Sequence, residues 1–419
     1  MPAFPGAEGA GSTTPGGRGG RVVWVTNLDD AGPGSLRAAC NVKGPRTVVF
    51  GTGGYIDLKS DIELTEPFCT IAGQSAPGGG VCVRGAGLVI STHDVVIRHM
   101  RFRLGAIDPA KVDRFRDCVH IAGHTPPHDI VLDHCSLSWA VSRNLVTWSG
   151  AHDLTVQWCI ISQPLRRPEN DGRKYGGMGF LIGDDTKNIT VHHCLLAHQY
   201  RRNPRLKHGV TAHLVNNVVY NWSDGGAMVM GDFAKDPRAA AVEANAINNW
   251  FQAGAETPDD APIVRALTTA RIYAAGNVAN ARWYESDLLA ATKTAASASE
   301  PFPSRPVTTQ PAEEAYRRVL AEAGATRPRR DATDERVVDS VRKSTGRYVG
   351  SEQDAGGWPD LDPGTAPLDT DRDGMPDAWE TLHGLDPDKP SDTADPDHDG
   401  YTNLEEYLNG TDPSRRQGM

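Results

Sequence analysis

Short runs of alternating apolar and polar residues recur along the first two thirds of the chain. Four of them align without gaps: HDVVIRHMRF at His93, HDIVLDHCSL at His128, HDLTVQWCII at His152 and KNITVHHCLL at Lys187. The register continues less regularly through TAHLVNNVVY, EANAINNWFQ and ARIYAAGNVA, with steps of 23 to 35 residues. This period predicts an all-β solenoid, in which each coil buries its apolar face against the next coil.

One position of the repeat is small or polar in the later units. It is occupied in order by Met100, Cys135, Cys159, Cys194, Asn217, Asn249 and Asn277. Equivalent positions of stacked coils form ladders, so we expect an interior row of thiols and, beyond it, a row of amides that bond to neighbouring backbone groups. Seven cysteines without a CxxC motif predict neither a zinc site nor a full disulfide framework.

The repeat ends near residue 290, and a segment of different composition follows. Residues 291–366 contain a connector rich in Ser, Thr, Pro and Ala, then two helix candidates, AEEAYRRVLAEAG and DERVVDSVRK. The first candidate has one apolar face, made of Tyr316, Val319, Leu320 and Ala323. We therefore expect a solenoid over residues 1–290 and a linker with a helical extension over residues 291–366 that packs on it.

The tail, residues 367–419, contains two copies of a calcium-loop pattern. DTDRDGMPDAWE and DPDHDGYTNLEE both match D-x-D-x-D-G-x-x-[DN]-x-x-E, a spacing that supplies the six to eight oxygens calcium needs. The expected ligands of the first loop are Asp369, Asp371, Asp373, the Met375 carbonyl, Asp377 and Glu380. Those of the second are Asp395, Asp397, Asp399, the Tyr401 carbonyl, Asn403 and Glu406. We predict an EF-hand-like module in which calcium is structural. The alternative is a disordered acidic tail.

The acidity of the chain resides in this tail. Of 419 residues, 53 are acidic and 43 are lysine or arginine, but residues 351–419 hold 18 of the acidic and only 4 of the basic residues. The rest is mildly basic, well short of a typical nucleic-acid binder, so we expect no nucleic-acid partner. No apolar run is long enough for a membrane span, and the chain opens without a secretory leader. A calcium module suits an exterior compartment, so we expect a secreted, periplasmic or cell-surface monomer whose leader is missing from this sequence.

One basic segment stands out in the solenoid. YRRNPRLKHG places Arg201, Arg202, Arg205 and Lys207 within seven residues, around Pro204. These cations repel one another, and nothing in the segment neutralises them. Either they extend into solvent or an anionic ligand binds there.

Motifs along residues 3–360 resemble bacterial pectate lyases of polysaccharide lyase family one. These motifs are AFPGAEGAG, GGRGGRVVWVTNLDDAGPGSLRAA, RTVVFGTGGYIDL, TIAGQSAPGGG, DHCSLSW, QWCIIS and LLAHQYRRNPR. The calcium loops are similar to a thrombospondin type 3 or dockerin-like module often appended to such enzymes. The resemblance implies a right-handed parallel β-helix and cleavage of an anionic polyuronate, of pectate or pectin type, by β-elimination.

The resemblance also assigns roles to the basic segment. The family's base is an arginine in an R-x-P-x-x-R pattern, which RNPRLK matches with Arg202 as the base and Lys207 at the second cationic position. Crowded cations disfavour one another's charged form, which helps Arg202 to accept a proton, and positive charge stabilises the enolate-like intermediate. Arg201 and Arg205 are then expected to contact the substrate.

The family's calcium site in the cleft is altered. One calcium-binding aspartate of the relatives matches Asp117, but the acidic pair that follows SW is replaced by Ser142 and Arg143. We expect Arg143, paired with Asp117, to take the place of the ion and to bind the uronate carboxylate directly, as the related pectin lyases imply for methyl-esterified substrate. Catalytic calcium is therefore doubtful. Further candidates for substrate contact are Arg173, Lys174, Asp133 and His134, although the last two, the family's DH signature, also suit a structural role.

Two other functions remain open on the residues alone. A glycoside hydrolase on the same fold would need two or more carboxylates in the cleft. The acids near RNPR in the repeat are few: Asp117, Asp133, Glu169, Asp171, Asp184 and Asp185. A non-catalytic solenoid that binds a polyanion is the other alternative. Ultraviolet absorbance separates the lyase from both alternatives, because only β-elimination creates a conjugated unsaturated uronate.

Overall fold

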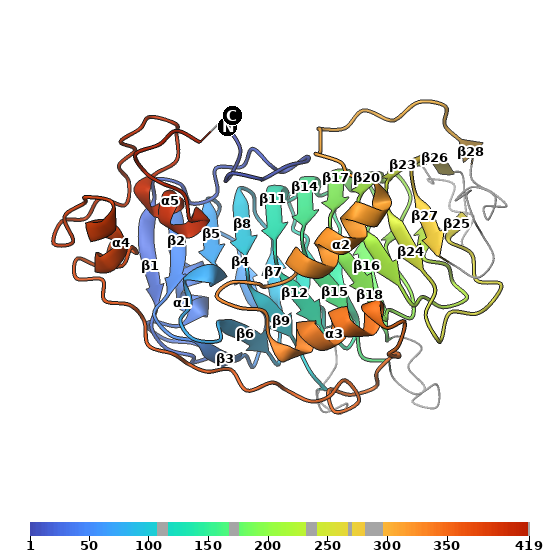
Figure 1. Cartoon of the computed structure of the whole chain (residues 1–419), viewed down its shortest axis with the longest axis horizontal. Helices are drawn as coiled ribbons and strands as arrows, with labels where there is room; N and C mark the ends of the chain where they lie inside the picture. Colours follow the sequence, from blue (N-terminus) through green and yellow to red (C-terminus); the bar gives the residue numbers. More distant parts are fainter. Residues whose placement is uncertain (107–115, 167–175, 232–240, 267–269, 281–295, 418–419) are drawn as a thin grey trace.

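The computed structural model describes residues 1–106, 116–166, 176–231, 241–266, 270–280 and 296–417. Its centre is a stack of coils, each of which contributes one strand to each of three parallel sheets (Figure 1). The chain β11, β12, β13 forms one such coil, and β14, β15, β16 form the next. The all-β prediction is confirmed: the molecule is a right-handed parallel β-helix.

The three sheets are named A, B and C in the order in which a coil passes through them. Sheet A contains β1 (Arg21–Val25), β2 (Arg46–Phe50), β5 (Cys69–Ala72), β8 (Val95–Arg98), β11 (His128–Asp133), β14 (His152–Gln157), β17 (Lys187–His192), β20 (Thr211–Val215), β23 (Val242–Ile247), β26 (Ala270–Ala275) and β28 (Ala296–Ser297). Sheet B contains β3 (Gly54–Asp57), β6 (Val81–Arg84), β9 (Arg101–Arg103), β12 (Ser136–Ser138), β15 (Ile160–Ser162), β18 (Leu195–Ala197), β21 (Val218–Tyr220), β24 (Trp250–Gln252) and β27 (Val278–Asn280). Sheet C contains β4 (Ile62–Leu64), β7 (Leu88–Ile90), β10 (Val119–Ile121), β13 (Arg143–Thr147), β16 (Met178–Ile182), β19 (Arg205–Leu206), β22 (Met228–Met230) and β25 (Val264–Ala266).

The predicted interior ladder is present as one continuous chain of hydrogen bonds. The backbone N–H of Cys135 donates to Cys159 Sγ at 3.4 Å, and that of Cys159 donates to Cys194 Sγ at 3.4 Å. The row then changes from sulfur to amide oxygen: Cys194 N donates to Asn217 Oδ1 at 3.0 Å, and Asn217 N donates to Asn249 Oδ1 at 2.9 Å. All seven cysteines are buried and free, so they act as small core residues.

The helices α2 (Ala312–Glu322) and α3 (Ala332–Arg342) cover sheet B, as Figure 1 shows. Their apolar faces pack against outward side chains of the sheet; the buried cluster contains Ile160, Leu195, Val218, Tyr220, Val319, Leu320, Val337, Val338 and Val341. Helix α1 (Leu36–Cys40) and the short 3₁₀ helix η1 (Gly73–Ser75) lie near the first coils. Burial of these faces explains why short helices are stable here.

A buried ionic cluster fixes α3 to sheet B. Arg103 on β9 bonds to Asp331 at 2.6 Å and to Asp334 at 2.7 Å, and the Arg103 and Asp334 side chains are at most 2 % exposed. Ser136 on β12 donates a hydrogen bond to Asp334 as well. Because every charge in this cluster has a partner, its burial does not leave an isolated ion.

The tail carries α4 (Asp377–Leu382) and α5 (Asn403–Asn409) and packs against the first coils of the β-helix. Its buried residues Met375, Leu404 and Leu408 contact Ala72 and Val22. Arg18 forms an ion pair of 2.7 Å with Glu405. The tail and the N-terminal segment therefore lie side by side near the first coils (Figure 1). Among the described helices, none combines the length and the apolar character needed to cross a bilayer.

Candidate functional site

The basic segment lies at the turn from sheet B to sheet C, beside β16 and β13. Arg143 begins β13 and is in register with Met178 of β16, and Met178 in turn forms a bridge with Arg201. Since neighbouring strands are about 4.8 Å apart, the backbones of Arg143 and Arg201 are separated by about 10 Å. Arg205 on β19 is in register with Leu181 of β16. The structure thus brings the predicted base segment and Arg143 to one stretch of sheet C.

Arg202 has a left-handed backbone conformation, with a φ of 72°. This conformation is uncommon for a residue with a Cβ and persists where the surroundings hold it. Here, Phe180 N donates to the Arg202 carbonyl at 2.8 Å, and Gly179 N donates to the Arg201 carbonyl at 2.9 Å. Arg201 is exposed, whereas Arg202 and Arg205 are half-buried. The segment is therefore attached to β16 by its backbone, and its three arginine residues are partly accessible.

Lys207 follows β19 and is held by two groups. Its Nζ lies 3.0 Å from an Asp184 carboxylate oxygen and 4.7 Å from the centre of the Trp148 ring. His208 Nδ1 is 3.4 Å from the same carboxylate. Lys207 therefore supplies positive charge from a fixed position. The sequence alone did not single out Trp148 or His208, because neither belongs to a recognisable motif.

Asp117 and Arg143 form the predicted ion pair. Arg143 Nε and Nη2 donate to the two Asp117 oxygens at 2.9 and 3.0 Å, and the Arg143 backbone N–H donates at 3.1 Å. The Asp117 side chain is 2 % exposed and that of Arg143 is 11 % exposed. Burial raises the pKa of Asp117, but the hydrogen bond from His120 and the charge of Arg143 outweigh it, so the pKa is lowered. Asp117 is therefore ionised at neutral pH.

His120 is a member of this group that the sequence analysis missed. Its Nδ1 is 3.1 Å from Asp117 Oδ2, and its side chain is 29 % exposed on β10. His120 lies three residues after Asp117, between the buried Val119 and Ile121. This alternation of apolar and polar residues was the signal in the sequence that the His120 side chain points outward from a strand. One buried carboxylate thus orients both a guanidinium and an imidazole.

The residues described around Asp117 do not fit a calcium ion. Both Asp117 oxygens accept hydrogen bonds from Arg143, whose positive charge occupies the position next to the carboxylate. The second family position, Ser142, is 5 % exposed and contributes no carboxylate. A divalent cation at this place would be repelled by the guanidinium.

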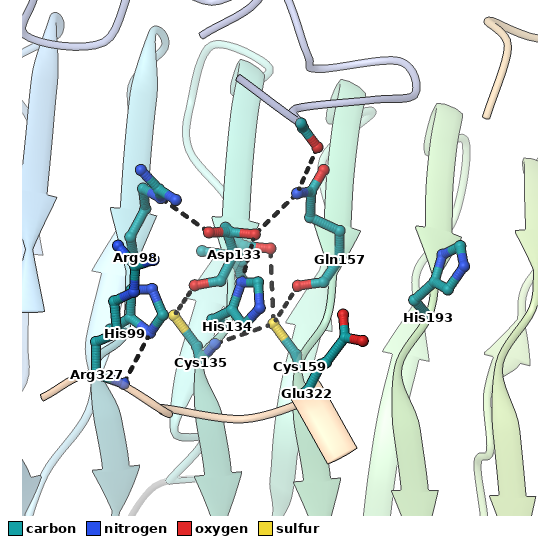
Figure 2. A network of polar contacts seen from close by, with 12 residues as sticks. Arg98, His99, Asp133, His134, Cys135, Gln157, Cys159, His193, Glu322 and Arg327 are labelled. Carbon is teal, nitrogen blue, oxygen red and sulfur yellow. Dashed lines mark hydrogen bonds and ion pairs between the residues drawn. The ribbon is translucent and has the colours of Figure 1, made fainter. Parts of the chain in front are cut away.

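Asp133 and His134 lie away from this site, in an environment that suits the structural role the sequence also allowed. They lie at the turn from sheet A to sheet B, beside the α2 end, as Figure 2 shows. Asp133 is fully buried and accepts from Arg98 at 2.8 Å, from Gln157 at 2.8 Å and from His134 at 2.9 Å. His134 stacks on His99 with ring centres 4.8 Å apart. A saturated, buried carboxylate of this kind stabilises the turn and has no oxygen left for a substrate.

Arg173, Lys174, Glu169 and Asp171 lie outside the described residues. Of the described acids of the hydrolase alternative, Asp117 is paired with Arg143 and Asp184 with Lys207. Hydrolysis requires one carboxylate to act as an acid and a second as a base or nucleophile. Asp117 and Asp184 are thus engaged in ion pairs, an arrangement that does not favour hydrolysis.

Three aspartates converge in each of the two loops of the tail. Ligand atoms of Asp369, Asp371 and Asp373 lie within 4.8 Å of one another, and the same holds for Asp395, Asp397 and Asp399. Both oxygens of Asp377 accept hydrogen bonds from Thr370 at 2.7 Å, and both oxygens of Asp373 and of Asp399 accept backbone hydrogen bonds. Several buried oxygens have no hydrogen-bond partner among the described residues: one each on Asp371, Asp395, Asp397 and Asn403, and both on Glu380 and Glu406.

The electrostatics of these loops match a cation site. Burial and the charges of neighbouring aspartates raise the pKa of Glu380 to about 7. Burial, followed by the nearby Asp399 and Asp397 charges, raises the pKa of Glu406 to about 7, despite a hydrogen bond from Thr411. Burial is also the main cause of the raised pKa of Asp373, about 6. Such shifts arise when carboxylates converge without a counterion, and a divalent cation would remove the repulsion.

Comparison with known proteins gives consistent relatives. A "Probable pectate lyase C" from Aspergillus terreus is 34 % identical over 403 residues, covering 92 % of this chain and 88 % of the relative. A second, from Emericella nidulans, is 34 % identical over 402 residues, covering 92 % of this chain and 87 % of the relative. These relatives are fungal, whereas the sequence motifs resembled bacterial enzymes.

Solved structures share the fold at low sequence identity. A pectate lyase bound to a hexasaccharide has a TM-score of 0.57 at 16 % identity, covering 76 % of this chain and 97 % of that one. The major cedar pollen allergen Jun a 1 also has a TM-score of 0.57 at 16 % identity, covering 76 % and 92 %. No protein-family model matches the chain.

Proposed function

Since the chain belongs to the pectate lyase family, we propose that it cleaves its polyuronate substrate with Arg202 as the base and with Arg143 in place of a catalytic calcium ion. The chain is a polysaccharide lyase of the pectate type, and its reaction is β-elimination. The observation that carries the finer proposal is the alignment of Arg143 and the Arg201–Lys207 segment on sheet C.

In β-elimination, the base removes the proton at C5 of a uronate. A C4–C5 double bond forms, the C4–O bond breaks, and the leaving oxygen takes up a proton. The C5 proton is a very weak acid because the adjacent carboxylate already carries a negative charge. The further negative charge that develops when this proton leaves needs fixed positive groups. The Arg202 carbonyl accepts a backbone hydrogen bond from Phe180, the Arg201 carbonyl accepts one from Gly179, and Arg205 and Lys207 follow within five residues. These charges favour a neutral guanidine at Arg202 and stabilise the intermediate.

Arg143 is proposed to bind the carboxylate of the bound uronate. Asp117 holds its Nε and Nη2, which fixes the plane of the guanidinium. A planar guanidinium is well suited to carboxylates because it donates two parallel hydrogen bonds. Substrate binding then depends on side chains and not on a metal.

Calcium is proposed to bind the tail and to stabilise it. The unpartnered oxygens of Glu380, Glu406 and Asn403, each buried in a loop of convergent carboxylates, support this assignment. Leu404 and Met375 are close in sequence to these ligands and pack on the first coils. Calcium would therefore also stabilise that end of the β-helix. A calcium-stabilised module further supports a secreted enzyme, and we keep a monomer as the expected state in solution.

The test is the appearance of ultraviolet-absorbing product from a polyuronate. The parent should produce it, and Arg202→Lys should reduce kcat by about 10²- to 10⁴-fold, the usual contribution of a general base. Arg342→Lys, an exposed residue on α3, serves as the matched control. Arg202→Lys with near-parental kcat and intact circular dichroism would show that the base lies elsewhere.

A further inference from the structure

A cavity of about 310 Å³ lies on the outer face of sheet A, away from the basic segment of sheet C. Two segments border it: the N-terminal segment (residues 3–18) and the crossing segment (residues 298–311), which both run along the same edge of the solenoid in Figure 1. Ala10 N donates to Thr190 Oγ1 on β17, and Asn245 on β23 exchanges two hydrogen bonds with the Phe302 backbone. The cavity opens over β20, between these two attachments.

The walls of this cavity are fixed to each other. Glu8 accepts hydrogen bonds from the backbone and the hydroxyl of Thr308, at 2.8 and 2.5 Å. Arg305 donates to Thr13 at 3.1 Å. A cavity with rigid walls loses little conformational entropy when a ligand enters, and its volume is at the lower end of the range of small-molecule sites.

The floor consists of two rows of polar side chains from consecutive strands. Strand register aligns Thr190, His213 and Asn245 in one row, and Asp153, Asn188, Thr211 and Glu243 in the other. Stacked coils repeat side chains at about 4.8 Å. The floor therefore contains hydroxyl, amide and imidazole groups at a regular spacing, of which Asn245 is already bonded to the Phe302 backbone and Thr190 to Ala10.

His213 is the side chain that points to a ligand. It is 8 % exposed, and within the described part of the chain its Nδ1 has no hydrogen-bond partner. Burial lowers its pKa to about 4, so the imidazole is neutral and offers one donor and one acceptor nitrogen at neutral pH. Buried polar atoms normally have a partner, and the His213 side chain belongs to the lining of the cavity.

The charges around the cavity do not favour an anion. Asp153 is paired with His152 at 2.8 Å, and Glu243 is paired with Arg271 at 3.1 Å. Arg305 is the one cation of the lining described here, against two carboxylates. This balance differs from the basic segment of sheet C, which suits a uronate. The half-buried Phe302 adds an apolar surface.

We propose that this cavity binds a neutral sugar residue. Sugar hydroxyls donate and accept hydrogen bonds, as the side chains of the floor do, and the carbon face of a sugar ring packs on apolar surface. The inference rests on the proposed polysaccharide substrate: a polysaccharide that carries neutral sugars would be held at sheet A while its uronate backbone is cleaved at sheet C.

The probes are galactose, arabinose, rhamnose and xylose, with galacturonate as the anionic comparison, measured by saturation-transfer difference NMR on the full chain. We expect at least one neutral sugar to bind in the millimolar range and to do so more tightly than galacturonate at this cavity. Ser304→Trp should abolish this signal, because Ser304 lines the cavity from the exposed crossing segment. His213→Phe should weaken binding about two- to ten-fold through the lost hydrogen bonds.

Ser299→Trp is the matched control, since Ser299 is exposed on the same segment and does not line the cavity. Ser299→Trp should retain sugar binding. Ser304→Trp, His213→Phe and Ser299→Trp should all cleave a linear oligouronate at the parental rate. No neutral-sugar signal in the parent, or a signal unchanged in Ser304→Trp, would overturn the proposal. The proposal would also be overturned if Ser304→Trp reduced galacturonate binding more strongly than it reduced neutral-sugar binding. Absence of lyase activity in the parent is a separate outcome, which would refute the proposed catalytic residues without affecting the NMR result.

Discussion

Replacing Arg143 with alanine should lower both stability and activity, by amounts that the structure allows to be separated. The Asp117 side chain is 2 % exposed and loses its two guanidinium hydrogen bonds of 2.9 and 3.0 Å. His120 and one backbone N–H remain as partners, so we expect the free energy of unfolding to fall by about 3 kcal/mol, the lower end for a broken buried pair. Loss of a charge-assisted contact to the substrate should cost about 1.5–3 kcal/mol, or about ten- to a hundred-fold in kcat/KM.

The double variant Asp117→Asn, Arg143→Ala separates these effects. A neutral amide removes the buried charge, so stability should largely return while kcat/KM remains about ten- to a hundred-fold low. Arg342→Ala is the control, since Arg342 pairs with Asp339 at 3.6 Å on an exposed helix face and should change stability by less than about 1 kcal/mol. Stability is measured by urea denaturation and activity by product absorbance, in excess chelator and after calcium is added back.

Three results would refute the reasoning. Arg143→Ala with parental kcat/KM would show that the guanidinium does not contact the substrate. Recovery of activity together with stability in the double variant would show that Arg143 acts only through the fold. Activity of the parent that vanishes in chelator, while circular dichroism shows an intact β-helix, and returns with calcium would mean that an ion takes part in catalysis.

The other predictions concern the tail, a buried histidine and the helical extension. A chain ending at Ala366 should lack a thermal transition that calcium raises and chelator lowers in the full chain; a full-chain transition indifferent to calcium would contradict the loop assignment. Burial lowers the pKa of His198 to about 4, below the unfolded value of about 6.5, so the unfolded state binds more protons between these values. The free energy of unfolding should therefore fall as pH decreases from about 6.5 toward 4, by up to roughly 3 kcal/mol for this residue, and His198→Gln should show a smaller slope in pH-dependent denaturation. Asp334→Asn should cost about 3 kcal/mol by urea denaturation, because Asp331 still balances part of the buried charge, whereas the exposed Asp339→Asn on the same helix should cost less than about 1 kcal/mol.

Residues whose partners follow from the repeat were predictable. The row of Cys135, Cys159 and Cys194 continues into Asn217 as expected, because equivalent positions of stacked coils must meet. The two calcium loops stay a prediction, made from expected ligands that lie within one dozen consecutive residues. The pairing of Arg143 with Asp117 was also predicted, and strand register explains it: the two positions lie on neighbouring coils.

The sequence did not predict at which turn of the coil a residue lies. Asp133 and His134 belong to a conspicuous motif, yet they lie at the turn from sheet A to sheet B, where Arg98 and Gln157 saturate the carboxylate. His120 carries no motif, yet it shares Asp117 with Arg143. A repeat indicates which residues are equivalent, but it does not indicate which turn of the coil faces the substrate.

By itself, the sequence determined the solenoid, its interior ladder and the basic segment, and it predicted two calcium loops, because each of these follows from local spacing or from a short period. The tertiary structure decided which side chains share one carboxylate, and it placed the tail beside the N-terminal segment near the first coils. It also created the cavity on sheet A, whose walls come from residues near 10 and near 304. Such contacts join segments hundreds of residues apart, and only the stacking of rigid coils, which sets the distance between distant positions, brings them together.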